Sequence, residues 1–237
     1  MKIRSVFNNR GLTLIELLIV FLVGGIIVAG IYRVFVAQSR AYIVQDQVVE
    51  VQQNIRVATE VLMKDLRMAG YDNNSVNSKI KIAVPVVAGD HSITVNYEYD
   101  NTTRYTVAYR RDAALSRLMR QVTTTKNDGT VTVNPEEILL GRRDAEDHDE
   151  IVDAFDLLYG VDQDDDGKMY DLNGDGKVDD SDWLPAANVG AMKVIAIRWT
   201  LTARPDQTNQ DVKKWVSPRT LTTVVNLKNL SLIQLTN

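Results

Sequence analysis

The chain has 237 residues and a formal net charge of −4, with two histidines and no cysteine. Without cysteine it can form no disulfide, thiol nucleophile, cysteine zinc site or iron–sulfur cluster. The sequence also carries no nucleophile elbow, zinc-protease helix or phosphate-binding loop, so we expect no catalysis and no small-molecule substrate. The length allows one domain carried on a long helix, or two small domains.

The N-terminus begins with a basic leader, residues 1–11, followed by an almost wholly apolar run over residues 12–32 that contains one acid, Glu16. A carboxylate inside a bilayer costs about a few kcal/mol, so we expect Glu16 to have a specific use. A secretory signal peptide places its apolar run before the cleavage site, whereas here the small residue Gly11 precedes the run. Cleavage after Gly11 would make Leu12 the new N-terminus, and positive charge would hold the leader in the cytoplasm.

An ordinary membrane anchor with a stray acid is the plainer interpretation of the same residues. The uncharged run after Glu16, Leu17–Tyr32, is short for a spanning helix, which needs about 20 residues. An anchor also gives no reason for a small residue, Gly11, to stand five positions before the acid. The spacing therefore favours a processed N-terminus.

Residues 11–17, GLTLIEL, resemble the class III signal of type IV prepilins. The resemblance implies that a prepilin peptidase cuts between Gly11 and Leu12, and that a methyltransferase then N-methylates Leu12. It also implies that Glu16 pairs with the terminal amine of a neighbouring subunit during assembly. Two charges that are costly alone in lipid become tolerable when they are paired. Leu12 stands where phenylalanine is commoner in the family, and because both are large and apolar we expect cleavage to persist.

Apolar residues continue at helical spacing beyond this run, and no proline interrupts them. The pattern predicts one helix from about Leu12 to Ala69, with Gly70 as the stop. We assign residues 12–37 to a transmembrane or filament-core helix and residues 38–70 to its amphipathic half. The apolar stripe of that half comprises Val44, Val48, Val51, Ile55, Ala58, Leu62, Leu66 and Ala69.

From residue 71 to residue 237, β-type patterns predict a globular head. Consecutive strands without long intervening helices favour an antiparallel sheet, whose apolar face we expect to pack on the helical stripe. The predicted fold class is therefore α+β, a long N-terminal helix on an antiparallel β-sheet head, which resembles the pilin fold. The stretch Leu115–Val122 fits a short helix or a strand. The predicted strands are Lys79–Val87, His91–Tyr99, Arg104–Arg111, Thr130–Val133, Ile151–Tyr159, Met192–Ala203 and Thr220–Leu227.

The segment Asp144–Asp182 holds sixteen of the 31 acidic residues and two lysines, so its balance is −14 and the rest of the chain carries +10. Within it, residues 162–182 read DQDDDGKMYDLNGDGKVDDSD and contain two overlapping calcium-type frames. Calcium takes about six to eight oxygen ligands, and alternate residues of a tight loop turn their oxygens inward. Acidic runs are usually solvated surface, but the regular spacing with two glycines favours bound calcium that orders the loop.

The better frame begins at Asp171 and matches the EF-hand loop pattern, with aspartate in place of glutamate at position 12. Gly176 at position 6 permits the positive φ of the sharp turn. A strand-like run precedes the loop, so we expect no flanking EF-hand helices. The expected ligands are Asp171, Asn173, Asp175, the Lys177 carbonyl, Asp179 and Asp182, with Asp162, Asp164 and Asp166 as a second, weaker set.

Four later stretches resemble minor pilins of the PilW kind, namely residues 64–71, 159–162, 194–203 and 220–229. The resemblance implies a minor pilin that waits in the inner membrane as a single-pass protein with its head in the periplasm. It also implies partners, other minor and major pilins, with which the chain primes a type IV pilus. The protein would then stay near the filament tip at the cell surface.

Other functions remain open on the sequence alone. A minor pseudopilin of a type II secretion system shares the same N-terminus and a similar head. A membrane-tethered calcium-dependent adhesin would need the acidic loop and not Glu16. The acidic net charge and the lack of an aromatic-studded basic motif predict no nucleic-acid partner, although the +10 outside the acidic segment allows a DNA-uptake pilin.

Overall fold

The structure is a computed structural model that describes residues 13–72, 82, 84–144, 150–206 and 216–231. Gly11 and Leu12, where cleavage and methylation are predicted, lie outside the described residues. The rest of the leader also lies outside the described residues, as do residues 79–81 and 83 of the predicted strand Lys79–Val87. The chain divides into two compact units, Met1–Asp46 and Gln47–Asn237, which are described separately below.

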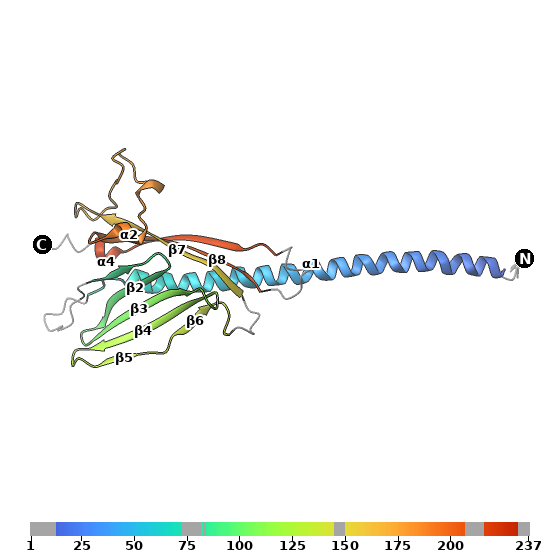
Figure 1. The fold of residues 1–237 in the computed structure, drawn as a ribbon, viewed down its shortest axis with the longest axis horizontal. Helices are drawn as coiled ribbons and strands as arrows, with labels where there is room; N and C mark the ends of the chain where they lie inside the picture. Colours follow the sequence, from blue (N-terminus) through green and yellow to red (C-terminus); the bar gives the residue numbers. More distant parts are fainter. Residues whose placement is uncertain (1–12, 73–81, 83, 145–149, 207–215, 232–237) are drawn as a thin grey trace, which may run out of the picture. The chain divides into compact units, whose positions relative to one another are not determined.

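Helix α1 extends from Leu14 to Met68 and confirms the predicted helix (Figure 1). The chain leaves it through Gly70, whose φ of 70° lies in the left-handed region that favours glycine. A Cβ at this position would lie 2.2 Å from Cδ2 of Leu230, in the short C-terminal helix α4 (Lys228–Ser231). The predicted stop at Gly70 is therefore required by both backbone conformation and packing.

The predicted apolar stripe of α1 is buried along most of its length. Val44 and Val48, at its N-terminal end, are partly exposed. Thr59 and Asp65 are buried beside the stripe, which the apolar pattern does not predict. The fully buried members are Val51, Ile55, Ala58, Leu62, Leu66 and Ala69.

The first sheet of the unit Gln47–Asn237 has six antiparallel strands in the order β1-β2-β3-β4-β5, with β6 also pairing with β4. Its central ladder is long, because β3 pairs with β4 along its whole length. The strands are β1 (Val86–Ala88), β2 (Ser92–Asp100), β3 (Thr103–Asp112), β4 (Arg117–Lys126), β5 (Val131–Val133) and β6 (Glu137–Leu140).

The second sheet has three antiparallel strands in the order β7-β8-β9. They are β7 (Glu150–Asp162), β8 (Lys193–Pro205) and β9 (Arg219–Asn226). The connection from β7 to β8 carries the acidic loop, the single 3-10 turn η1 (Asp180–Asp182) and the short helix α2 (Ala186–Val189). A strand therefore precedes the loop and one short turn follows it, as expected in place of EF-hand helices.

The antiparallel head is confirmed, but it contains two sheets where one was expected. The backbone N–H of Val152 in β7 donates to the carbonyl of Ser116, in the β3–β4 turn, at 2.8 Å. The N–H of Leu157 donates to the carbonyl of Asp90, in the β1–β2 turn, at 3.1 Å. Strand β7 thus bonds to turns at the ends of the first sheet's strands instead of extending that sheet along an edge.

Most individual strands follow the prediction closely, with three exceptions. Of the predicted strand Lys79–Val87, only Val86 and Val87 among the described residues belong to a strand, β1. Most of the undecided stretch Leu115–Val122 belongs to strand β4, since Leu115 and Ser116 lie in the preceding turn and the strand begins at Arg117. Strand β6 was not predicted, because its four residues, EILL, show no alternation of apolar and polar side chains. Its pairing with β4 is therefore a tertiary feature and not a local one.

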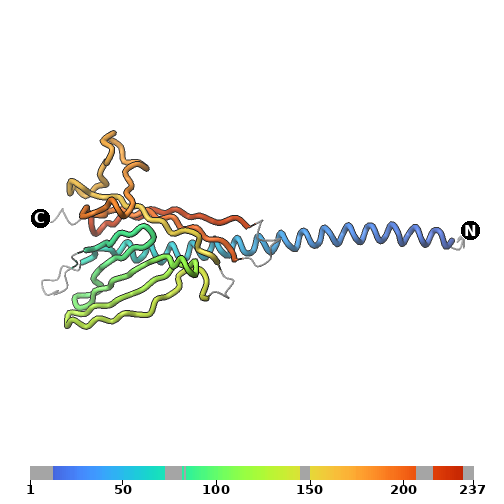
Figure 2. The backbone as a smooth tube through the Cα atoms, viewed as in Figure 1, coloured from blue at the N-terminus to red at the C-terminus, as the bar shows by residue number. Residues whose placement is uncertain are grey.

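One hydrophobic core joins α1 to both sheets within the unit Gln47–Asn237. Figures 1 and 2 show the C-terminal half of α1 running along strands of both sheets. The largest fully buried side chains of this core include Leu62 from α1, Tyr109 from the first sheet and Trp199 from the second. Because each sheet covers part of the wide helical stripe, neither could bury it alone.

A buried polar cluster fixes α1 to the first sheet. The hydroxyl of Tyr109 donates to Oδ2 of Asp65 at 2.5 Å, and Arg120 Nη2 lies 2.9 Å from the same oxygen. Burial, together with the Asp65 carboxylate, raises the pKa of Tyr109 well above its usual value, so it remains a hydrogen-bond donor. The buried Asp65 is thus paired with a cation and a neutral donor, which offsets its desolvation.

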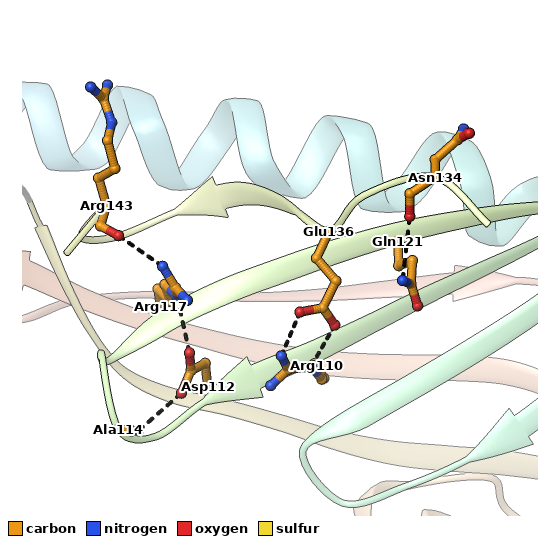
Figure 3. A network of polar contacts seen from close by, with 8 residues as sticks. All are labelled: Arg110, Asp112, Ala114, Arg117, Gln121, Asn134, Glu136 and Arg143. Atoms are coloured by element: carbon orange, nitrogen blue, oxygen red, sulfur yellow. Dashed lines mark hydrogen bonds and ion pairs between the residues drawn. The ribbon is translucent and has the colours of Figure 1, made fainter.

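A second polar network lies at the surface of the first sheet (Figure 3). Arg110 donates two hydrogen bonds to Glu136, at 2.8 and 2.6 Å, and Arg117 donates to Asp112 at 3.0 Å and to the Arg143 carbonyl at 2.9 Å. These contacts hold the segment around β6 against β3 and β4. The Arg110–Glu136 pair is partly exposed, and pairs of this kind contribute little to stability.

We predict that Tyr109→Phe lowers the free energy of unfolding by about 1.5–3 kcal/mol, because it removes a hydrogen bond to a buried carboxylate. The matched control, Arg110→Ala, removes the exposed pair with Glu136 and should have a much smaller effect. Urea unfolding of the full chain in detergent, followed by tryptophan fluorescence, compares the two. Equal losses would contradict the role given to the buried cluster.

Tyr159 links the two sheets through its hydroxyl. It donates to the Gly89 carbonyl at 2.7 Å and accepts from the Gly89 N–H at 3.0 Å. Burial raises the pKa of Tyr159 to about 12. A raised pKa contributes stability that is fully present below the ordinary tyrosine pKa of about 10 and is lost as pH rises through the folded value.

We therefore predict that the head loses stability between about pH 10 and pH 12, and that Tyr159→Phe makes this part of the profile less steep. Tyr99, whose side chain is exposed, supplies the control substitution Tyr99→Phe. Unfolding midpoints in denaturant, measured at half-unit pH steps, test the expectation. A profile that keeps the same alkaline slope in Tyr159→Phe would show that other groups cause the loss.

Candidate functional site

The N-terminal turn of α1 is closed by reciprocal hydrogen bonds between Thr13 and Glu16. The backbone N–H and the hydroxyl of Thr13 each donate to Oε2 of Glu16 at 3.0 Å, and the Glu16 N–H donates to the Thr13 hydroxyl at 3.3 Å. This arrangement is a capping box, in which the Glu16 side chain accepts from the Thr13 backbone N–H and the Thr13 side chain accepts from the Glu16 backbone N–H. The sequence prediction assigns Glu16 to assembly and omits Thr13, although Thr-x-x-Glu is the signature of such a cap.

The helix that follows exposes an apolar surface on all sides in the unit Met1–Asp46. Among the described residues, α1 is long and apolar enough to cross a membrane, with a mean hydropathy of 2.8 over its best eighteen-residue window, none of it buried. Phe21 is 70% exposed and Phe35 66% exposed. Contiguous apolar exposure of this extent marks a surface that contacts lipid or other proteins.

The frame that begins at Asp171 is stabilised by its own backbone. The Asp171 carboxylate accepts from the N–H groups of Gly174 at 2.7 Å and Gly176 at 2.6 Å. The Asn173 and Asp175 side chains each accept from the N–H two residues ahead, both at 2.8 Å. These bonds form successive tight turns and involve the oxygens that a bound ion would use.

Asp182, at position 12 of this frame, is fully buried and already satisfied. Its Oδ1 accepts from the Leu172 N–H at 2.7 Å, and its Oδ2 accepts from the Asp179 N–H at 2.8 Å. Together with Asp179 it forms the capping box of η1. Asp182 thus closes the loop as a structural residue.

The turn η1 is also attached to the second sheet. Arg198 of β8 lies over the Trp183 ring at 4.7 Å and contacts the Asp180 carboxylate at 2.5 Å. The cation–aromatic contact and the ion pair hold the C-terminal end of the loop in place.

The second, weaker set of predicted ligands is the one that the structure brings together. One carboxylate oxygen from each of Asp162, Asp164 and Asp166 lies within 4.8 Å of the other two. Among the described residues, no three acids of the frame that begins at Asp171 meet in this way. Asp162 is the last residue of β7 and is buried, whereas Asp164 and Asp166 are exposed.

The histidines take no part in these sites as far as the structure describes them. The Nδ1 atom of His91 lies 3.1 Å from an Asp156 oxygen and 3.1 Å from the Phe155 carbonyl, on the exposed surface of the head. His148 lies outside the described residues.

Comparison with known proteins identifies the N-terminal segment. Residues 7–32 match the family described as the prokaryotic N-terminal methylation motif. The chain therefore carries a type IV pilin signal that includes Gly11, Leu12 and Glu16. No curated protein matches the sequence. A type IV-like pilin from Thermus thermophilus aligns with 76% of this chain and 96% of its own, at 13% identity and a TM-score of 0.46.

We predict that Thr13→Ala weakens the first turn of α1 by about 1 kcal/mol, because it removes the hydroxyl from the capping box. Thr13→Ser keeps the hydroxyl and should retain the cap. Amide hydrogen exchange of the full chain in micelles measures the effect, which should be confined to the first turn after Leu14. Equal exchange rates in the two variants would mean that the cap does not hold this end of the helix.

Proposed function

We propose that this protein is a minor pilin that primes assembly of a type IV pilus and remains near the filament tip. The observation that carries the proposal is the methylation motif at residues 7–32 joined without a break to α1. The first half of this helix is apolar and exposed, and its second half is built into the core of a β-rich head. Such a chain is suited to a structural role in a filament, not to catalysis.

The physical chemistry of α1 supports two successive environments for its apolar half. Before assembly, the leader's positive charge would keep it in the cytoplasm, the helix would cross the inner membrane, and the head would lie in the periplasm. After cleavage, the helix would leave the lipid only if other helices covered the same side chains. Close packing against a bundle of like helices provides that cover.

Glu16 has a defined place in this scheme. Its carboxylate is held by Thr13 at the first turn of α1, and Thr13 directly follows in sequence the residue at which cleavage would create the new amine, Leu12. An amine from a neighbouring subunit would pair with this carboxylate, and the pair would be tolerated in apolar surroundings where each charge alone would not. Pairing of this kind sets the axial register between subunits.

The role of a minor subunit is supported by the four stretches that resemble PilW-type minor pilins. Two of them meet at the end of α1, where Asn229 Nδ2 donates to the carbonyls of Arg67 at 3.1 Å and Ala69 at 3.4 Å. The other two are neighbours in the second sheet, where Tyr159 pairs with Ile197. The resemblance therefore covers residues that pack together in the head.

The first test is the intact mass of the membrane-extracted protein from cells with and without prepilin peptidase. We expect the peptidase to remove residues 1–11 and a methyl group to be added at Leu12. The strain without peptidase should keep the full leader. An unprocessed chain in both strains would contradict the proposal and leave a membrane-anchored head.

The second test concerns Glu16. We expect Glu16→Ala and Glu16→Gln to be cleaved normally and to reduce the number of surface filaments by about tenfold or more. Without the carboxylate, the terminal amine of the neighbouring subunit would be buried without a partner, which costs about 3–5 kcal/mol. The control, Glu60→Ala, removes an exposed acid of the same helix and should leave filament numbers unchanged. Electron microscopy of cells that express each variant gives the counts.

These outcomes separate the proposal from its alternatives. Normal piliation in Glu16→Ala together with lost surface attachment in acidic-loop variants would instead support a membrane-tethered calcium-dependent adhesin. Lost protein secretion with normal piliation would support a minor pseudopilin of a type II secretion system.

A further inference from the structure

The acidic cluster at the end of β7 has an unusual member. The Asp162 side chain has no exposed surface, and among the described residues its Oδ1 atom has no hydrogen-bond partner. The other oxygen, Oδ2, accepts from the Gly167 N–H at 3.0 Å. A buried carboxylate oxygen without a donor is costly, and native structures usually supply it with a donor, a water or an ion.

The same carboxylate faces two exposed acids. Oxygens of Asp164 and Asp166 lie within 4.8 Å of an Asp162 oxygen and of each other. Three carboxylates this close repel one another unless a cation lies between them. The unpartnered Oδ1 of Asp162 and the convergence of the exposed acids are separate observations that point to the same missing charge.

The charge balance around the cluster fits a divalent ion. Lys193 Nζ lies 3.6 Å from Asp162 and 3.7 Å from Asp165, and Lys168 Nζ lies 3.4 Å from Asp166. With Asp164, four carboxylates therefore share two ammonium groups, which leaves two negative charges. One divalent cation would neutralise these two remaining negative charges.

We propose that one calcium ion binds at the end of β7, coordinated by Asp162, Asp164 and Asp166, and not in the frame that begins at Asp171. Carboxylate oxygens on a loop suit the larger, adaptable coordination shell of calcium. In the other frame, Asp182 is buried with both oxygens bonded to backbone N–H groups, so it cannot turn toward an ion without breaking η1.

The site would join the loop to the head. Asp162 ends β7 and pairs in register with Lys193 of β8, so an ion here attaches the acidic loop to the second sheet. A Cβ on Gly167 would lie 2.6 Å from the carbonyl of Ser231, so the loop also packs closely against the end of α4. Calcium would therefore order the loop against the C-terminal part of the head.

The affinity should be modest, because the nearby Lys193 opposes a cation and only three carboxylates are proposed to coordinate the ion. Extracellular calcium modules bind at about 10⁻⁴–10⁻³ M, which is the range we expect. The physiological occupancy rests on the proposed location of the head outside the cytoplasm. The binding test itself does not, since it is made on the purified protein.

The test is equilibrium dialysis of the full chain in detergent against radioactive calcium chloride, after removal of bound metal with a chelator. We expect one ion per chain. Asp164→Asn and Asp166→Asn change exposed residues and should preserve folding, and each should weaken binding by about tenfold or more. Asp162→Asn is not used, since this residue is buried and could disturb the fold.

Two further variants make the test specific for this cluster. Asp171→Asn and Asp175→Asn are the matched controls at positions 1 and 5 of the other frame, and they should change the dissociation constant by less than about twofold. Lys193→Gln removes the competing cation 3.6 Å from Asp162 and should tighten binding several-fold. A generally acidic surface would respond equally to all four aspartate substitutions.

Three results would overturn the proposal. The first is an absence of calcium uptake at 10⁻² M, a concentration about ten times the weakest dissociation constant expected. The second is a selective loss of binding in Asp171→Asn or Asp175→Asn. The third is an equal loss of binding in all four aspartate variants. Because the readout is ion binding, failure here leaves the proposed pilus function unaffected. Conversely, calcium binding would persist if the processing and piliation tests failed.

Discussion

A single helix has to be stable in two very different surroundings, and the rest of the molecule follows from that constraint. In its first half, α1 exposes large apolar side chains such as Phe21 and Phe35, for which the described chain supplies no cover. In its second half, the same helix supplies the central stripe of the head's core. Water is a poor solvent for the first half, so lipid or other helices must cover it. The capped Glu16 is the one acid that this apolar half carries.

The head is held together without cysteine, and buried polar contacts fix its parts in place instead. Asp65 joins α1 to Tyr109 and Arg120 in the first sheet. Tyr159 joins the second sheet to Gly89, in the turn between β1 and β2. Each of these contacts is specific in direction, because a hydrogen bond requires a donor and an acceptor in a defined geometry. Together they define how the helix and the two sheets of the head pack.

Local patterns in the sequence predicted the helix, its stop at Gly70 and most strands, because periodicity and backbone preference act over a few residues. The division into two sheets was not predictable, because it depends on contacts such as that between Val152 and Ser116, which are distant in the chain. The proposed choice between the acidic frames rests on burial. Matching to the EF-hand pattern favoured Asp171, yet the structure buries Asp182 as a turn cap and gathers the acids around Asp162. Thr13 was predictable from its capping box.

The most direct test of the account is to identify what covers the apolar half of α1 in filaments. A photo-reactive phenylalanine analogue at Phe21 would report its neighbours, since this side chain is 70% exposed and lies in the apolar half of α1, shortly after Glu16. In filaments sheared from cells, we predict a cross-link to another pilin subunit, and its loss in the Glu16→Ala background. Cross-linking to lipid alone, with no adduct in any filament fraction, would contradict the claim that this helix leaves the membrane to join a pilus.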